Sequence, residues 1–160
     1  MSVIPQYVLA PYMPTPPKVV QGMLEIARVS NNDLVYDVGC GDGRVVIAAA
    51  SRYGARGVGI DVEPYWVEQS TSNAAAAGVT HLVQFEVADA MTLDFSLATV
   101  ITLYLVGWST ARIVPIIMDQ VSEGTRIVSH NFGSSDWKAA RVESTTDEEG
   151  GSHTLYLWTK

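Results

Sequence analysis

Three glycines follow a short apolar segment and a carboxylate in Val35-Tyr-Asp-Val-Gly-Cys-Gly-Asp-Gly-Arg44. Because Gly39, Gly41 and Gly43 carry no Cβ, the chain can adopt a positive φ there and lie close against a ligand. The apolar stretch 44–52 predicts a helix that presents free N–H groups and a partial positive charge to an anion. The segment therefore predicts a strand, a ligand-binding turn and a helix.

The spacing of the glycines separates two cofactor classes. Dinucleotide enzymes carry G-x-G-x-x-G, whereas here the third glycine comes one residue earlier and Arg44 stands in its usual place. A dehydrogenase is therefore disfavoured. The pattern is typical of the loop of an S-adenosylmethionine enzyme, since that cofactor has no pyrophosphate. The alternative is a structural glycine turn in some other α/β protein.

Acidic residues follow three predicted strands. Asp37 lies in the first, Asp61 ends residues 57–61, and Asp89 follows residues 82–87. Ligands of parallel sheets bind beyond the carboxyl ends of the strands. We expect Asp37, with the glycine-loop backbone, to face the methionine part of the cofactor, Asp61 to accept both ribose hydroxyls, and Asp89 to accept from the adenine amine.

Each of these acids also has a structural alternative. Asp61 could cap the helix that begins at Pro64, and Asp89 could cap a turn. Their occurrence at three successive strand ends favours a ligand, and an acidic cleft suits a cationic sulfonium. The cofactor-binding residues expected from this pattern are Asp37, Gly39, Cys40, Gly41, Gly43, Asp61, Val62, Ala88, Asp89 and Ala90.

Length and composition indicate a single compact domain. The chain has 160 residues, of which 48% are hydrophobic, so we expect one domain over 1–160. The N-terminus lacks the basic and apolar regions of a secretory signal. The longest apolar stretch, 97–108, is shorter than the ~20 residues that span a bilayer. We expect a soluble, cytoplasmic protein.

Net charge, cysteine content and histidine spacing limit the binding partners and the chemistry that the chain is expected to have. The net charge of −7 disfavours nucleic acid and favours small molecules or basic protein segments. Cys40, the single cysteine, excludes an internal disulfide and is expected to be a small loop residue rather than a nucleophile. His81, His130 and His153 lack the spacing of a metal site, so no metal is expected.

The order of the predicted elements indicates the fold class. Helices are expected over 15–28, 43–53, 64–77 and 109–121, and strands over 34–38, 57–61, 82–87, 98–105, 125–130, 140–146 and 152–158. Thr15 is expected to cap the first helix and Ser109 or Thr110 the last, which Pro115 should kink or shorten. The sequence thus predicts an α/β fold: a doubly wound, Rossmann-like, mostly parallel seven-stranded sheet with a C-terminal antiparallel hairpin.

Over essentially its whole length the chain resembles class I S-adenosylmethionine-dependent methyltransferases. It is most similar to small archaeal protein-lysine methyltransferases, which are related to mitochondrial enzymes acting on the ATP synthase c-subunit and the adenine nucleotide translocase. The resemblance rests on residues 12–16 (YMPTP), 36–44 (YDVGCGDGR), 102–105 (TLYL) and 124–132 (GTRIVSHNF).

The resemblance implies how the cofactor is held. S-adenosylmethionine would bind and S-adenosylhomocysteine would leave as the product. Residues 1–16 would form a lid in which Tyr12, Pro14 and Thr15 fold over the cofactor, with the Thr15 hydroxyl near its carboxylate. Leu103 would join the cofactor-binding residues.

The resemblance also places the catalytic pocket. The catalytic residues expected there are Tyr104, His130 and Asn131. Tyr104 and His130 would line the pocket, although either could be a core residue with a bonded polar tip. An Asn/Asp-Pro-Pro-Tyr segment is absent, which disfavours adenine or glutamine as acceptor. Two departures fall on the acceptor side: Asn131 replaces the family's usual acid, and 106–110 (VGWST) lacks its usual asparagine.

Three functions remain open at this stage. The first is methylation of a protein lysine, for which burial among Tyr104, Trp108, Phe132 and Trp137 would favour the neutral amine. Each of these aromatic residues could equally be core. The second is methylation of a small-molecule thiol, hydroxyl or amine, suggested by Asn131. The third is cofactor binding without catalysis.

Overall fold

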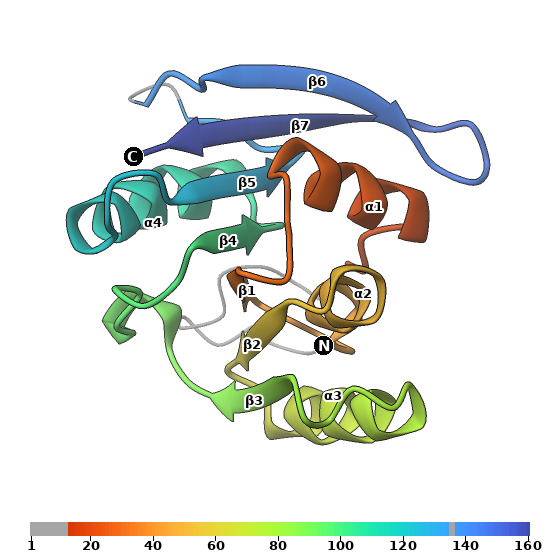
Figure 1. The fold of residues 1–160 in the computed structure, drawn as a ribbon. Helices are drawn as coiled ribbons and strands as arrows, with labels where there is room; N and C mark the ends of the chain where they lie inside the picture. Colours follow the sequence, from red (N-terminus) through yellow and green to blue (C-terminus); the bar gives the residue numbers. More distant parts are fainter. Residues whose placement is uncertain (1–12, 135–136) are drawn as a thin grey trace, which may run out of the picture.

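The structure is a computed structural model that describes residues 13–134 and 137–160. Tyr12 and most of the predicted lid lie outside the described residues. A central sheet is covered on both faces (Figure 1). Within the described part of the chain, no helix is long and apolar enough to cross a membrane.

The sheet has the predicted topology. Its strands are β1 (Leu34–Val38), β2 (Arg56–Asp61), β3 (Val83–Val87), β4 (Val100–Leu103), β5 (Arg126–His130), β6 (Arg141–Thr146) and β7 (Ser152–Thr159). They are ordered β3-β2-β1-β4-β5-β7-β6, with β1 to β5 parallel and β7 antiparallel to both β5 and β6. The doubly wound sheet with a C-terminal hairpin is thereby confirmed.

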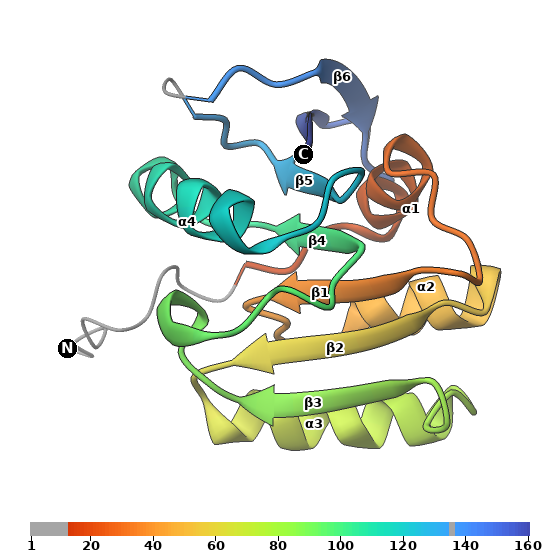
Figure 2. The same ribbon diagram turned by 60° about the vertical axis from the view of Figure 1, so that its left-hand side comes forward.

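The helices form two layers. They are α1 (Pro17–Ile26), α2 (Arg44–Tyr53), α3 (Pro64–Ala76) and α4 (Gly107–Gln120), with a short 3-10 turn η1 (Ala90–Thr92). Figure 2 shows β1, β2 and β3 pointing the same way, with α2 and α3 behind them and η1 and α4 on the other side. The carboxyl ends of β1 to β3 therefore meet at one edge.

Two hydrophobic clusters hold these layers together. Alternate residues of each central strand point to opposite faces. Val35 and Val100 pack with the helices α1 to α3, whereas Val38 and Ile101 pack with α4. Because strand order reverses between β1 and β4, a crevice is expected at their carboxyl ends. The glycine loop follows β1 directly at this point.

The first helix begins later than predicted. The Ncap residue of α1 is Pro16, no side chain caps the helix, and the carbonyl of Pro16 accepts from Val19 and Val20. Thr15 precedes a proline, which favours extended backbone and disfavours the helical region. The prediction that Thr15 caps α1 is therefore wrong.

The last helix begins earlier than predicted. It starts at Gly107 with Val106 as Ncap, and Thr110 donates its hydroxyl to the Leu105 and Val106 carbonyls from inside the first turn. The prediction of Ser109 or Thr110 as cap is wrong. Pro115 lies within α4, which continues to Gln120 rather than ending there.

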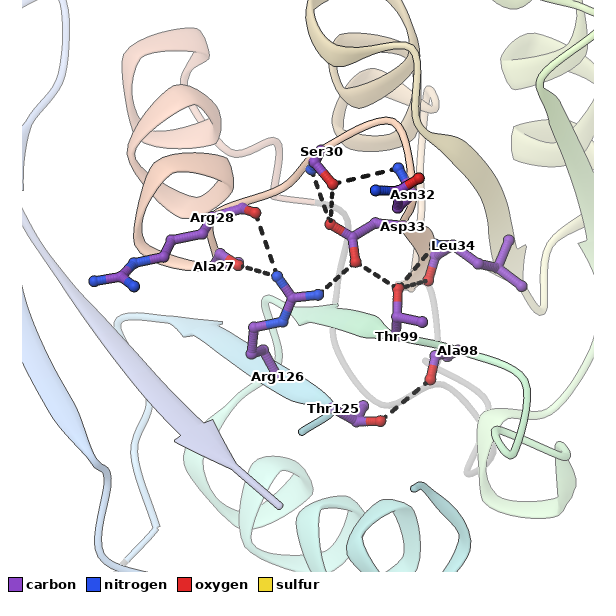
Figure 3. Close-up of polar contacts among 10 residues, drawn as sticks. All are labelled: Ala27, Arg28, Ser30, Asn32, Asp33, Leu34, Ala98, Thr99, Thr125 and Arg126. Atoms are coloured by element: carbon purple, nitrogen blue, oxygen red, sulfur yellow. Dashed lines mark hydrogen bonds and ion pairs between the residues drawn. The ribbon is translucent and has the colours of Figure 1, made fainter. Parts of the chain in front are cut away.

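A polar cluster fixes the opposite edge of the sheet (Figure 3). Asp33 pairs with Arg126 at the start of β5 and accepts from the Thr99 hydroxyl at 2.8 Å. Arg126 also donates to the Ala27 carbonyl at 2.6 Å, at the end of α1. Burial raises the pKa of Asp33, but the Ser30 N–H, Thr99 and Arg126 outweigh it and hold that pKa below its usual value. This cluster connects α1, β1, β4 and β5.

Candidate cofactor and acceptor site

The glycine loop adopts the backbone that its sequence predicts. Gly39, Gly41 and Gly43 have φ angles of 72°, 53° and 84°, all in the left-handed region. At Gly43 a Cβ would also lie 3.0 Å from atoms of Phe85 and Ser70. Both the backbone angle and the space therefore require glycine there.

The N–H groups of the loop are bonded within the protein. Those of Gly39 and Cys40 donate to the Ile60 carbonyl at 2.8 and 2.9 Å. That of Gly41 donates to the Asp61 carboxylate at 3.0 Å. The loop is therefore fastened to the end of β2, and these three N–H groups are not available to an anion.

The start of α2 is partly occupied as well. The Arg44 N–H donates to the Asp42 carboxylate at 3.2 Å, and the Arg44 guanidinium pairs with the same carboxylate at 2.6 Å. The Asp42 carboxylate thus occupies part of the N-terminus of α2, where the sequence predicted that an anion would bind. The surroundings suit a cation better than an anion.

Two residues of α3 hold the loop, and no sequence pattern had indicated either of them. Ser70 donates to the Gly41 carbonyl at 2.6 Å, and Asn73 donates to the Asp42 carbonyl at 2.9 Å. Ser70 is fully buried. A small polar residue on the inner face of a helix was the available signal, because a buried hydroxyl requires a partner.

Cys40 is buried beside the loop. Burial, together with the carboxylates of Asp37 and Asp61, raises the pKa of the Cys40 thiol far above its usual range. A thiol that stays protonated is a poor nucleophile. This supports the interpretation of Cys40 as a small loop residue.

Asp37 is a buried carboxyl at the end of β1. The Thr102 hydroxyl donates to it at 2.7 Å. Burial raises the pKa of Asp37 to about 7, and the carboxylates of Asp61 and Asp42 add to the increase, although the Thr102 bond opposes it. A cationic group at this edge would favour the ionised form. The acid fits the sulfonium or ammonium of the predicted cofactor.

Asp61 is oriented by backbone donors. One of its oxygens accepts from Gly41 and the other from the Glu63 N–H, each at 3.0 Å. The Ncap residue of α3 is Glu63, so Asp61 is not that cap. Because each oxygen has a second lone pair, Asp61 keeps the capacity to accept from ribose hydroxyls.

Asp89 does have the structural role given as its alternative. It is the Ncap residue of η1 and accepts from the Met91 N–H at 2.9 Å. Ala88, next to it, donates its N–H to the Asp61 carbonyl at 3.0 Å, which joins the ends of β2 and β3. Val62 is half-buried and Ala90 is buried. Adenine binding here stays a prediction.

The predicted acceptor residues form an aromatic stack. The rings of Tyr104 and His130 lie 3.9 Å apart between centroids, and Phe132 stacks on Tyr104 at 6.3 Å. Burial raises the pKa of Tyr104, although a side-chain hydrogen bond with Asn131 opposes the shift. Tyr104 thus stays a neutral phenol at neutral pH.

Asn131 has a positioning role in the fold. Its φ is 65°, a left-handed conformation that asparagine tolerates better than most residues. Its N–H donates to the Thr154 carbonyl at 2.7 Å, and its side-chain oxygen accepts from the Thr154 N–H at 2.9 Å. Asn131 therefore fastens the residue after β5 to β7 and contacts Tyr104.

His130 is fully buried and bonded through both ring nitrogens. Nδ1 lies 3.2 Å from the Thr15 hydroxyl, and Nε2 lies 2.7 Å from Nδ1 of His153. Burial, with a smaller contribution from His153, lowers the pKa of His130 to about 4. The imidazole is therefore neutral at physiological pH.

The segment 13–16 is fixed at two points. The Thr15 hydroxyl bonds His130, and the Arg44 guanidinium donates to the Thr15 carbonyl at 2.9 Å. Pro14, within this segment, is exposed. The structure thus brings Thr15 between the glycine loop and the aromatic stack.

Other predicted residues lie elsewhere. The side chain of Leu103 is fully buried in the core that includes α4, whereas Leu105 lies 3.8 Å from a Cβ placed on Gly39. Trp108 is 58% exposed. Trp137 packs against the core, and its carbonyl accepts from the Trp158 indole at 2.7 Å. Among the described residues, no group of three metal-ligating side chains occurs.

Comparison with known proteins agrees with this geometry. Residues 37–141 match the family described as the ANTKMT methyltransferase domain. The chain belongs to this family. The predicted methyltransferase class and its S-adenosylmethionine chemistry are confirmed.

Two curated relatives differ in length and in the acceptor that their names give. The chain is 37% identical to a protein-lysine N-methyltransferase of Saccharolobus islandicus (strain REY15A), across 99% of this chain and 96% of that protein. It is 30% identical to the ATP synthase c-subunit lysine N-methyltransferase of Xenopus laevis, across 79% of this chain but only 55% of that protein.

A solved structure matches nearly the whole fold. It is described as an RNA methyltransferase from Salinibacter ruber in complex with S-adenosyl-L-homocysteine, and it is 46% identical to this chain with a TM-score of 0.85. The match covers 92% of this chain and 93% of that chain. The predicted fold and cofactor class are confirmed by this likeness.

Proposed function

We propose that this protein is an S-adenosylmethionine-dependent protein-lysine N-methyltransferase. The observation that carries the proposal is the 37% sequence identity, over almost the full length of both proteins, to an archaeal protein-lysine N-methyltransferase of similar size. The geometry supports it, because acidic side chains lie at the carboxyl ends of β1 and β2, where the cofactor is expected. The uncharged rings of Tyr104 and His130 lie close by.

The cofactor would be held by three strand ends. Asp37 would face its cationic methionine end, Asp61 would accept from the ribose hydroxyls, and Asp89 would accept from the adenine amine. When bound, the cofactor supplies a methyl group on a cationic sulfur. The glycine loop and Thr15 would fix its position, since in-line transfer requires close alignment of the reacting atoms.

The acceptor lysine would lie against the aromatic stack. A lysine must lose its proton before it attacks, which costs roughly 4 to 5 kcal/mol at neutral pH, at about 1.36 kcal/mol for each pKa unit. Burial against Tyr104 and Phe132 disfavours the charged amine. Because His130 is neutral, it adds no positive charge beside the ammonium group of the lysine. Its low pKa also makes it a weak base for the proton that the lysine must lose.

The proposal is tested with purified enzyme and cofactor carrying a labelled methyl group. Lysine-rich proteins, structured RNA and a panel of amine, thiol and hydroxyl metabolites are offered separately. Label on protein lysines, with little on RNA or metabolites, is expected. Label confined to metabolites would replace the proposal with the small-molecule alternative, and binding without any transfer would support a noncatalytic role.

A second candidate acceptor is RNA. The 46% identical structure from Salinibacter ruber is described as an RNA methyltransferase, which favours this candidate. The net charge of −7 opposes it, because RNA binding depends on positive side chains that neutralise phosphates. Label transfer to RNA that weakens steeply with added salt would support this candidate over lysine.

A further inference from the structure

Four polar side chains form a continuous hydrogen-bonded chain next to the aromatic stack. It runs from the Thr15 hydroxyl to His130, then to His153 on β7, and ends at Asp147 in the hairpin turn. The three links measure 3.2, 2.7 and 2.7 Å. His130 is fully buried, whereas 19% of the Asp147 side chain is exposed.

Asp147, at the exposed end of this series of hydrogen bonds, sets the donor and acceptor of each bond. The hydrogen bond from His153, followed by those from the Gly151 and Glu149 N–H groups, holds the pKa of Asp147 below its usual value. An ionised carboxylate can only accept. His153 must therefore donate through Nε2, and in the neutral form of the imidazole this leaves Nδ1 as an acceptor.

The same logic fixes the tautomer of His130. When Nδ1 of His153 accepts in this way, His130 must donate through Nε2. Nδ1 of the neutral His130 is then unprotonated, and the Thr15 hydroxyl must donate to it. A carboxylate in the hairpin thus decides whether the His130 nitrogen that faces the segment 13–16 carries a proton.

The hairpin turn is built to hold this carboxylate. The second oxygen of Asp147 accepts from the N–H groups of Glu149 and Gly151 at 2.9 and 2.8 Å. The turn also contacts the start of α1, where the Lys18 N–H donates to Glu148 at 3.0 Å. In Figure 1 the turn between β6 and β7 lies at the same end of the sheet as the arrowhead of β5.

We propose that His153 and Asp147 are positioning residues of the methyltransferase site: they orient His130 so that its unprotonated Nδ1 accepts from Thr15 and holds the segment 13–16 beside the cofactor loop. This inference rests on the proposed function, which gives the segment and the aromatic stack their catalytic use. In this proposal His153 and Asp147 act only through His130 and do not touch the reacting atoms.

The test reverses the donors and acceptors of these hydrogen bonds with a substitution that keeps the shape of the side chain. In Asp147→Asn the amide oxygen keeps the two turn bonds, so the amide nitrogen faces His153 as a donor. Both histidines should then switch tautomer, and Nδ1–H of His130 should point at Thr15. The 15N chemical shifts of the imidazole nitrogens report which nitrogen carries the proton. Glu149→Gln removes the same charge from the same turn and should leave the tautomers unchanged.

The functional readout is cofactor affinity. Calorimetry with S-adenosylhomocysteine should give binding weakened on the order of tenfold in Asp147→Asn, as is common when an outer hydrogen-bond partner is lost. Glu149→Gln should bind like the parent protein. Thr15→Val should weaken binding similarly and Thr15→Ser should restore it, which keeps the test decisive even if Asp147→Asn folds poorly.

Two results would overturn the inference. One is an unprotonated Nε2 at His130 in the parent protein. The other is equal affinity in Asp147→Asn, Thr15→Val and Glu149→Gln. Neither readout depends on the acceptor, so a parent protein that methylates no lysine would refute the proposed function and leave this inference to be decided separately.

Discussion

At the scale of single residues, the decisive feature is a carboxyl group whose charge depends on its ligand. Asp37 is buried, and its pKa is raised to about 7, first by burial and then by the neighbouring acids Asp61 and Asp42. A cationic cofactor would stabilise the ionised form. Protonation at Asp37 and cofactor binding should therefore oppose each other.

This gives a prediction for cofactor affinity. The dissociation constant of S-adenosylmethionine should fall as the pH rises through about 7, because binding requires ionised Asp37. Asp37→Asn should bind more weakly and lose this pH dependence. Calorimetry between pH 6 and 8 (about one unit to either side) measures both effects. Glu68→Gln, at an exposed position on α3, is the matched loss of charge and should behave like the parent protein.

A second residue-scale prediction separates backbone strain from steric conflict. Gly43 and Gly124 both have positive φ angles, 84° and 89°, but only Gly43 has neighbours within 4 Å of an added Cβ. Gly124→Ala should cost about 1 kcal/mol of unfolding free energy from backbone strain. Gly43→Ala should cost clearly more, because Phe85 and Ser70 must move. Equal costs in urea denaturation would contradict the steric argument.

At the scale of elements, the ion pair of buried Asp33 and half-buried Arg126 joins α1 to three strands (Figure 3). Removing the cation leaves a buried acid without its partner. Arg126→Met should therefore lower the unfolding free energy by about 3 kcal/mol. Asp33 has a lowered pKa, so its contribution is present above about pH 4 and is lost as the pH falls further.

The pairing is checked with a double-mutant cycle. Asp33→Asn removes the charge that Arg126→Met leaves unpaired, so the double variant should be more stable than the sum of the two single losses implies. Additive losses would mean that the two side chains do not stabilise each other. Such additivity would contradict the assigned role of the pair.

The limits of sequence reasoning also belong to the scale of elements. The order of helices and strands followed from apolar periods and glycines, and the hairpin followed from the residues at 147–151. Helix starts were harder. Thr15 suggested a cap by its residue type, but the prolines after it moved the start of α1, and its hydroxyl instead bonds His130, which lies 115 residues away.

The same reason explains which site residues were missed. Asp37, Asp61 and the glycine loop share one sequence pattern, so they could be identified together. Ser70, His153 and Asp147 act through contacts between distant segments, and no local spacing marks them. Thr102 carried a weak signal as a hydroxyl within an otherwise apolar strand, and its partner is the Asp37 carboxyl.

At the scale of the whole molecule, two buried groups act oppositely on stability. His130 has a folded pKa lowered to about 4, so its contribution is present above about 6.5 and is lost as the pH falls toward 4. Asp37 has a raised folded pKa, so its contribution grows as the pH falls from about 7. The two opposite effects of pH on the unfolding free energy should therefore partly cancel in the parent protein.

This cancellation is testable by substitution. His130→Gln removes one of these effects, so the unfolding free energy of the variant should increase, relative to that of the parent protein, as the pH falls from 6.5 toward 4 (the ordinary and folded values for His130). Denaturant titrations across this range measure the difference. A constant difference between variant and parent would show that His130 does not titrate between the folded and unfolded states.

The proposed activity comes down to one reaction, the transfer of a methyl group from S-adenosylmethionine to a lysine side chain. The most direct measurement is peptide mapping by mass spectrometry of lysine-rich proteins after incubation with enzyme and labelled cofactor. We expect label on lysine Nζ, formed with one S-adenosylhomocysteine for each methyl group and strongly reduced in Asp37→Asn. Turnover of the cofactor that labels RNA or small molecules while every lysine stays unmodified would contradict it.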